Sequence, residues 1–437
     1  MSPFLALCGL FAPSQDLAPG ATITLDQALA YADRNAFAIL IQQTRVEKQR
    51  QDVLAKTGQL GPTLYLNGNY TRFDRPTTAT FSGNTVTIVP IQQSYGEASA
   101  TMPIDISGNM HRLMRASKAS QFAQEETLLA QRADIRRDVT SAYYGVLRAR
   151  SQVLVAQEAL ASDVERTRNV EQRFKAGVVA QVDVLRAQTQ QAQSESNLIA
   201  ATTGLELAKQ SLNNVLARPI ESTFDVADVP AANPPAPDAA KLSEEAQRSR
   251  HEARALAETA RALTEVRKYV QHANEPTLNL GLNYTGNVKP LGFGQRPEVG
   301  TGVLSLNWPI LDSGYYRAEV RAARQDEEQA QLQLKQVRLQ ISLEVRQAAT
   351  SLVNAEQRLK VADRQVETAR VALRQTMLRH EQGVAILLEV IEAQRDLTSA
   401  EFAQVSAKYD VLQALADLQR AAGASLFNTL RAPNTLE

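Results

Sequence analysis

Proline is absent from two long stretches of this chain, residues 104–218 and 310–432. The remaining prolines, apart from Pro433, lie in 1–103 and 219–309. Because a proline in a helix interior costs about 3 kcal/mol, stretches this long without one predict very long helices. A helix over 109–175 alone is expected to extend about 100 Å, given the rise per residue of an α-helix. The chain is therefore predicted to be mainly α-helical and built as two long helical halves.

The two halves align with each other as copies of one repeat. The segment 103–108, PIDISG, aligns with 309–314, PILDSG, at an offset of 206 residues. The same offset places Gly177 on Gly383. Each copy is predicted to contain a helix, a strand, a loop, a second strand, a very long helix, a glycine turn and a final helix.

Boundaries for these parts follow from the alignment. We expect a first repeat at 21–217, a proline-rich linker at 218–240 and a second repeat at 241–427. The expected β-hairpins lie at about 62–105 and 276–311, and the expected helix turns at about 174–182 and 380–388.

The long helices carry a coiled-coil seam. From Ile341 to Leu373, apolar residues recur at alternating spacings of four and three, which is the a/d pattern of a heptad repeat. In the first copy the equivalent positions are apolar from Ile135 to Leu160 and then become Asp163 and Thr167, where the seam fades. Helices of this length suit a rod or a tube better than a compact globule.

Short segments alternate in polarity with the period of a β-strand. One side is small or apolar and the other is rich in Thr, Asn and Ser, as in 63–71, 277–285 and 301–310. Spanning strands with lipid on one side and water on the other show this pattern, as does a half-buried soluble sheet. The near absence of charge favours the membrane. Four strands with open edges are not tolerated in lipid, so several chains are expected to share one barrel.

Charge and composition exclude several functions. The 47 Lys and Arg balance 47 Asp and Glu, so the chain lacks the basic character of a nucleic-acid-binding protein. The single cysteine, Cys8, excludes an internal disulfide and a cysteine-rich metal site. The four histidines are scattered and no nucleophile or phosphate-binding motif is present. We predict that the chain is not an enzyme and has no cofactor and no metal site.

Residues 1–14 form a short apolar stretch that ends in small residues. No Lys or Arg precedes it, so we expect a degenerate or truncated export signal. Two alternatives remain open, a lipid anchor at Cys8, for which Leu7 is a poor preceding residue, and an unstructured apolar terminus.

These features together resemble the TolC-like outer-membrane efflux proteins, over about residues 24–425. The resemblance rests on the repeat, on the strand-to-helix junctions and on two turn motifs, namely Pro103, Gly108, Pro309, Gly314, 173–188 and 379–394. It implies a homotrimer with a 12-stranded transmembrane β-barrel, four strands per chain, on an α-helical periplasmic tunnel in the outer membrane of a Gram-negative bacterium. It also implies passive export of drugs, toxic compounds, metal ions or secreted protein, with an inner-membrane transporter and a periplasmic adaptor as partners and outer-membrane lipid around the barrel.

Acidic residues in the second turn motif are the candidate gate. Glu389 and Glu392 are three residues apart and share a helix face, so a threefold axis would bring six carboxylates to one constriction that selects cations. In the first copy Asp183 occupies the first of these positions and Arg186 the second. The alternative is an ordinary solvated helix face. Family members often carry a basic residue where this chain has Ala385, which leaves open how a closed gate is held.

The two hairpin tips are the candidate docking surface for an adaptor. Gly177 and Gly383 permit the chain reversal because glycine tolerates positive φ. The apolar residues beside them are expected to be exposed, and either to seat the helical hairpin of an adaptor or only to pack the tip; they are Val178, Val179, Val384 and Ile386. The competing function is a periplasmic coiled-coil adaptor or structural protein without a pore, whose β regions should carry charge.

Overall fold

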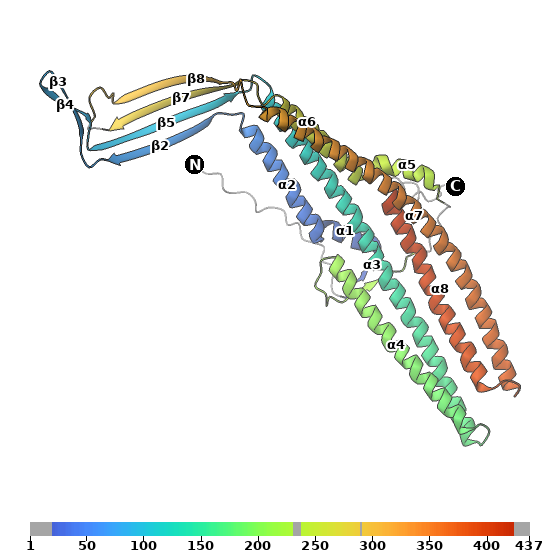
Figure 1. Cartoon of the computed structure of the whole chain (residues 1–437). Coiled ribbons are helices and arrows are strands. Elements are labelled where there is room, and N and C mark those ends of the chain that lie inside the picture. The colour runs from blue at the N-terminus through green and yellow to red at the C-terminus, as the bar shows by residue number, and fades with distance from the viewer. Residues whose placement is uncertain (1–19, 230–236, 289–290, 424–437) are drawn as a thin grey trace, which may run out of the picture. The chain divides into compact units, whose positions relative to one another are not determined.

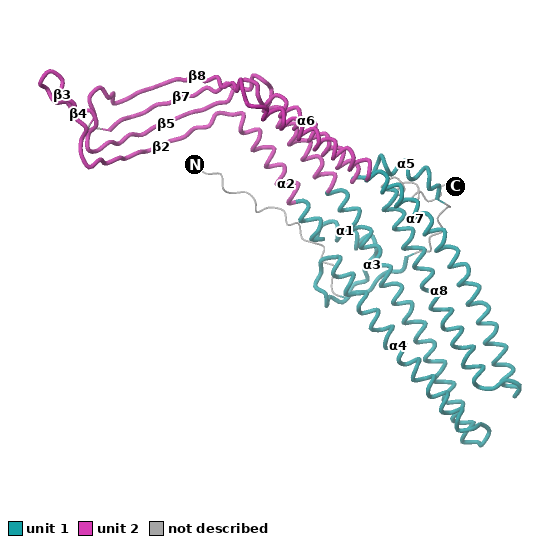
Figure 2. Tube along the Cα trace, viewed as in Figure 1, with its two compact units in different colours: residues 1–43, 128–251, 337–437 teal, residues 44–127, 252–336 magenta. Residues whose placement is uncertain are grey.

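A computed structural model of the chain describes residues 20–229, 237–288 and 291–423 (Figure 1). The predicted export signal with Cys8, and part of the predicted linker, lie outside the described residues. The chain divides into two compact units (Figure 2). Unit 1 takes the residues up to 43, 128–251 and those from 337, and unit 2 takes 44–127 and 252–336. Each unit therefore combines segments from both halves of the sequence.

Long helices dominate the structure. They are α1 (Leu25–Asn35), α2 (Phe37–Gly58), α3 (Asn109–Lys175), α4 (Gln181–Val215), α5 (Ala239–Ser249), α6 (His251–Gln271), α7 (Tyr315–Glu381) and α8 (Leu387–Ala422). Both α3 and α7 have 67 residues, and α3 coincides with the helix predicted from the proline-free stretch. Among the described residues, no helix is both long and apolar enough to cross a membrane.

Strands form one four-stranded sheet and two small pairs. They are β1 (Thr22–Ile23), β2 (Thr63–Arg72), β3 (Thr77–Phe81), β4 (Asn84–Val89), β5 (Gln92–Ile104), β6 (Asp225–Val226), β7 (Thr277–Val288) and β8 (Glu298–Asn307). The large sheet, in unit 2, is antiparallel in the order β2-β5-β7-β8. The β3–β4 hairpin lies in the longer loop of the first copy and was not predicted, whereas β1 and β6 pair in parallel within unit 1.

The register of the large sheet places all its leucines on one face, whereas Val299 and Val303 lie on the other. Leu64 lies opposite Ala100, which lies opposite Leu282, and residues directly opposite each other point the same way. The same face carries Leu66, Ala98, Leu278, Leu280, Leu304 and Leu306. The other face carries mainly Thr, Asn and Ser, and its carboxylate, Glu97, accepts a hydrogen bond of 2.7 Å from the Asn283 amide. The alternation predicted for 63–71, 277–285 and 301–310 is therefore in phase across the sheet, and β5 shares it.

Pro103 is tolerated near the end of β5 because β5 pairs there with one neighbouring strand, β7, and not with β2. The last β2–β5 pair is Thr63 with Thr101, so Pro103 lies beyond β2 and faces Asn279 of β7 on its other side. A residue without an N–H is tolerated where no ladder bond is lost.

The core of unit 1 surrounds the middle of α3. Its side chains come from β1, α1, α3, the end of α4 and α8. The hydroxyl of buried Tyr143 lies 2.9 Å from the carbonyl oxygen of Ile23 and 2.7 Å from that of Ala227. It therefore joins α3 to β1 and to the residue that follows β6. Burial raises the pKa of Tyr143 to about 12.

Burial confirms the predicted coiled-coil seam. In α7 the seam residues Ile341, Val345, Leu352, Ala355, Ala362, Val366 and Leu373 are buried, and in α3 so are Ile135, Val139, Val146, Ala149, Val153 and Ala156. The two positions where the apolar pattern fades, Asp163 and Thr167, are also buried.

Candidate functional site

Two glycine turns end the long helices in unit 1. Between α3 and α4 the chain reverses at Gly177, whose φ is 73°, and the Val178 N–H donates to the Arg173 carbonyl at 2.9 Å. Between α7 and α8 it reverses at Gly383, with φ 78° and an equivalent bond from Val384 at 2.8 Å. This is the Schellman motif, in which a residue with positive φ lets the following N–H satisfy a carbonyl of the last helical turn. Both predicted turns are therefore built in the same way.

Apolar side chains beside these turns divide into exposed and packed ones. Val178 and Val384 are each 65% exposed and Ile386 is 59% exposed. Val179 was expected to be exposed with them, and this is wrong, because it is half-buried. It packs against a cluster in which Val170, Val184 and Ala187 of the first hairpin meet Leu387 and Ile391 of α8. The cluster joins the two hairpins just behind their tips.

A histidine organises the second tip. His380 Nδ1 lies 2.9 Å from the carbonyl oxygen of Ala385, and its Nε2 lies 3.4 Å from Arg173 Nη1. If Nδ1 carries the proton it donates to the carbonyl, and Nε2 then accepts from the guanidinium. Ala385 itself is buried. The histidine thus binds the backbone at Ala385, where the chain has no basic side chain.

The three candidate gate carboxylates differ in their surroundings. Asp183 lies 3.8 Å from the guanidinium of Arg186, so its charge has a counter-charge on the same helix. Glu389 is half-buried and Glu392 is exposed. Within the part of the chain that the structure describes, neither glutamate has an ion pair. Asp183 and Glu389 also lie in the first turns of α4 and α8, where a negative charge favours the helix.

The predicted strand-to-helix junctions lie where the sequence placed them. Pro103 ends β5 and Gly108, with φ 70°, directly precedes α3. Pro309 follows β8 and Gly314, with φ 89°, directly precedes α7.

Sequence reasoning missed the two aspartates that hold these junctions. Asp312 accepts bonds from the Gly314 N–H at 3.1 Å and the Tyr316 N–H at 2.7 Å, which lower the pKa of its carboxyl. Asp105 lies 2.6 Å from His111 Nδ1. Burial raises the pKa of Asp105, but the hydrogen bonds of His111 outweigh it and the net direction is downward. The preference of aspartate for helix N-termini is the signal that would have found both.

A polar network centred on buried Asp163 interrupts the first hairpin. It consists of Asp163 and Arg166 on α3, Gln190 and Ser194 on α4, and Gln394 and Arg395 on α8, and we call it the Asp163 network. Asp163 is 2% exposed. Burial lowers the pKa of the Arg166 guanidinium, and the nearby Asp163 carboxylate raises it by less. The fading of the seam at Asp163 and Thr167 was the visible signal, but nothing in the sequence identified the partners.

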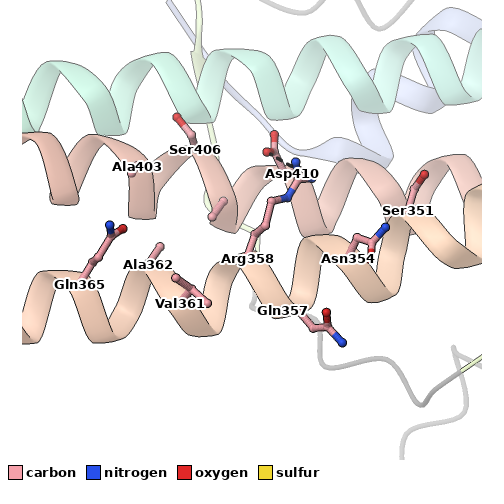
Figure 3. Close-up of a pocket in the computed structure, with 11 residues that line it drawn as sticks. Ser351, Asn354, Gln357, Arg358, Val361, Ala362, Gln365, Ala403, Ser406 and Asp410 are labelled. Atoms are coloured by element: carbon pink, nitrogen blue, oxygen red, sulfur yellow. Dashed lines mark ion pairs between the residues drawn. The ribbon is translucent and has the colours of Figure 1, made fainter.

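A groove of about 890 Å³ lies between α7 and α8 (Figure 3). Small and amide side chains line most of it, and Arg358 reaches across to Asp410 at 3.9 Å. Asp410 also lies 3.3 Å from Arg148 of α3, so its charge is balanced from two helices. Elsewhere in the described ranges, no group of three or more His, Cys, Asp and Glu is placed to hold a metal ion. The ion pairs of Asp410 with Arg358 and Arg148 therefore link α8 to α7 and α3 beside the groove.

Comparisons with known proteins agree on one family. Residues 28–218 and 242–424 match the model of the outer membrane efflux protein family. Nodulation protein T of Rhizobium leguminosarum bv. trifolii is 23% identical over 87% of this chain and 81% of its own length. Outer membrane efflux protein BepC of Brucella suis is 23% identical over 92% of this chain and 85% of its own. The crystal structure of the Campylobacter jejuni CmeC outer membrane channel shares the fold, with a TM-score of 0.79 and 16% identity over 91% of this chain and 85% of that one.

Proposed function

The chain belongs to the outer membrane efflux protein family, and on this basis we propose that it is the outer-membrane exit duct of a tripartite export system in a Gram-negative bacterium. Substrate would pass through the duct passively, because the energy for export is supplied by an inner-membrane transporter. A periplasmic adaptor would connect the duct to that transporter. The observation that carries the proposal is the four-stranded sheet, with one apolar face and two edges that pair with no other described strand.

The sheet calls for neighbouring copies. Backbone N–H and C=O groups on the free sides of β2 and β8 are not satisfied in lipid unless another strand pairs with them. Pairing β8 of one chain with β2 of the next closes the sheet, and three chains of four strands give a 12-stranded barrel. The apolar face then contacts lipid, and the Thr, Asn and Ser face lines a water-filled interior.

The two repeats, 21–217 and 241–427, would supply equal shares of the assembly. Each gives two strands to the barrel and one helical hairpin to a periplasmic tunnel, and the linker at 218–240 joins them. The carboxylates of Glu389 and Glu392, with Asp183 in the other hairpin, would ring the constriction at the tunnel tip.

Reconstitution tests the proposal directly. We expect the purified protein to be a trimer by mass and to produce discrete conductance steps in planar bilayers. Recovery of the protein in the soluble periplasmic fraction, or a monomeric mass without conductance, would contradict it and favour the adaptor interpretation. The sheet argues against that interpretation, because a soluble adaptor domain would not present a four-stranded apolar face whose charged residues, Arg72 and Glu298, lie only near one end.

The exposed valines at the tips are proposed to contact the adaptor. Val178 and Val384 are equally exposed and occupy equivalent places after the two glycines. We expect Val178→Asp combined with Val384→Asp to abolish cross-linking to the adaptor, because burying a carboxylate in an apolar contact is strongly unfavourable. Trimers should remain intact in the variant. Loss of the trimer instead would mean that these residues only pack the tip, and Val178→Ala with Val384→Ala is the matched control.

A further inference from the structure

We propose that three arginines at the start of α7 bind the phosphate groups of anionic phospholipids in the periplasmic leaflet of the outer membrane. They are Arg317, Arg321 and Arg324, and we call them the α7 arginine stripe. The inference rests on the proposed function for the presence of that membrane. It rests on the geometry of unit 2 for the position and the charge of the three side chains.

The stripe follows one side of the helix. Its members are spaced by four and three residues, which places them on the same face, and all three are exposed. With a rise of about 1.5 Å per residue, the stripe extends about 10 Å along α7. The headgroup region of a bilayer leaflet is about 5–8 Å thick. The stripe is therefore long enough to cross the headgroup layer.

Exposed apolar residues connect the stripe to the apolar face of the sheet. Strand β8 ends at Asn307 and α7 begins at Tyr315, and both belong to unit 2 (Figure 2). Between them, Ile310 and Leu311 are 85% and 89% exposed, and Trp308 and Tyr315 are also exposed. Tryptophan and tyrosine gather where the hydrocarbon of a bilayer meets its headgroups. The first turns of α7 are therefore expected at the depth of the lipid phosphates.

The charge of the stripe has no counter-charge at ion-pair distance. Among the described residues, none of the three arginines forms an ion pair, and Arg321 Nε donates to the backbone carbonyl of Arg317 at 3.3 Å. Asp312, just before the helix, accepts two backbone N–H groups of the first turn. Glu319 is two residues from Arg317 and from Arg321, a spacing that puts it on another side of the helix. Three positive charges are thus available to an external anion.

Basic residues at this place are unfavourable for the helix itself. The N-terminal end of a helix carries a partial positive charge, so acidic side chains are favoured in its first turn. Neither α3 nor α7 has an acidic residue there. By the repeat offset of 206 residues, the stripe corresponds to His111, Arg115 and Lys118 on α3. Both copies therefore place basic residue types where the helix gains nothing from them, which indicates a partner outside the helix.

The two copies differ in the carboxylates around these positions. In the first copy, His111 lies 2.6 Å from Asp105, and Arg115 lies 3.2 Å from Glu265 of α6. In the second copy, Leu311 occupies the position that corresponds to Asp105. The chain itself supplies the counter-charges of the first stripe, whereas the α7 arginine stripe lacks them.

The proposed trimer would not restore the second carboxylate. If β8 pairs with β2 of the next chain, α2 of that chain lies beside α7 as α6 lies beside α3. Pro62 aligns with Pro276 at an offset of 214 residues, so the α2 residue that corresponds to Glu265 is Gln51, which carries no charge. Other carboxylates of α2, those of Glu47 and Asp52, are the competing partners that the experiment has to exclude.

Arginine suits a lipid phosphate at this depth. Its planar guanidinium donates two parallel hydrogen bonds to a phosphate, and its aliphatic stem can lie against apolar groups while the charge stays in the headgroup layer. Clusters of basic residues beside a membrane-spanning segment attract anionic lipids. We therefore expect a preference for a lipid with net negative charge over one whose headgroup is zwitterionic.

Neutralising the stripe tests the inference on the assembled protein. We titrate the purified trimer in detergent with phosphatidylglycerol and count bound lipids by native mass spectrometry. In Arg317→Gln/Arg321→Gln/Arg324→Gln, we expect the affinity for phosphatidylglycerol to fall by roughly tenfold or more, because each basic residue at the surface contributes to the attraction. The matched control is Arg346→Gln/Arg364→Gln/Arg374→Gln, which removes the same charge from exposed positions farther along α7 and should bind lipid as the unaltered protein does.

The outcomes separate the possible partners of the stripe. Equal affinity of the unaltered protein and the triple variant would overturn the inference, and so would displacement of the lipid by inorganic phosphate at the same concentration. Dissociation of the triple variant's trimer in lipid-free detergent would show that the arginines pair with α2 of a neighbouring chain, which also overturns it. An unaltered protein that is monomeric and does not conduct would instead overturn the proposed function. Phosphatidylglycerol binding that the triple variant loses would then still support the stripe.

Discussion

Replacing Leu66 and Leu304 with arginine is expected to prevent assembly of the protein into the outer membrane. Both side chains are on the apolar face of the sheet, and Leu66 is 79% exposed. An arginine on the lipid face of a transmembrane strand costs about 2–4 kcal/mol at the bilayer midplane. Two such residues cost each chain about 4–8 kcal/mol, which is comparable to the whole stability of an ordinary folded domain, about 5–15 kcal/mol. The measurement is the fraction of protein recovered as trimer in outer-membrane preparations.

The neighbouring residues on the opposite face provide the control. Asn67 follows Leu66 and Ser305 follows Leu304, so Asn67→Arg/Ser305→Arg introduces the same charge on the same strands but on the polar face. We expect this variant to assemble and to shift the ion selectivity of the channel. Equal assembly of both double variants would show that the apolar face does not meet lipid.

Neutralising the tip glutamates is expected to remove the cation preference of the channel. The carboxylates of Glu389 and Glu392 lack ion pairs among the described residues, so in a trimer they would leave six uncompensated charges near one constriction. In a salt gradient, we expect the current through the unaltered channel to reverse sign near the equilibrium potential of the cation. In Glu389→Gln/Glu392→Gln the permeability ratio of cation to anion should fall by roughly an order of magnitude, because the rings that select cations are gone.

Two further variants make the result specific. Glu389→Asp/Glu392→Asp keeps the charge and should keep the selectivity. Glu356→Gln/Glu367→Gln removes the same charge from α7, away from the tip, and should leave the reversal potential unchanged. An unaltered preference in the Glu389→Gln/Glu392→Gln channel would mean that these residues are an ordinary solvated helix face. Raising the salt concentration should weaken the preference of the unaltered channel, because exposed charges are screened.

Features with a local period were predictable from the sequence. The length of α3 follows from the absence of proline, and the seam and the strand faces follow from spacings of three, four and two residues. The repeat then placed Gly177 and Gly383 at equivalent turns, since the same local motif makes the same local structure. These elements depend on neighbours within a few residues, which a sequence displays directly.

Contacts between residues far apart in the chain were not predicted from the sequence. Asp163 was seen only as a fault in the seam, although Ser194 and Gln190 lie on the next helix and bind it. Val179 was placed with the exposed valines because the cluster that it packs against is completed by Leu387 and Ile391 of α8, more than two hundred residues later in the chain. The contact of His380 with Arg173 was missed for the same reason. None of these pairings leaves a trace in the spacing of either partner.

The unequal interiors of the two hairpins have a consequence for symmetry. In the proposed trimer, duplication would place six similar hairpins around the axis, and six identical ones would have to move together or not at all. Because only the first hairpin of each chain contains the Asp163 network, the ring has threefold rather than sixfold equivalence. Two sets of three hairpins, one with a polar and one with an apolar interior, would then be able to move separately. Divergence between two copies of a gene segment would in this way convert a static cylinder into a mechanism with moving and stationary parts.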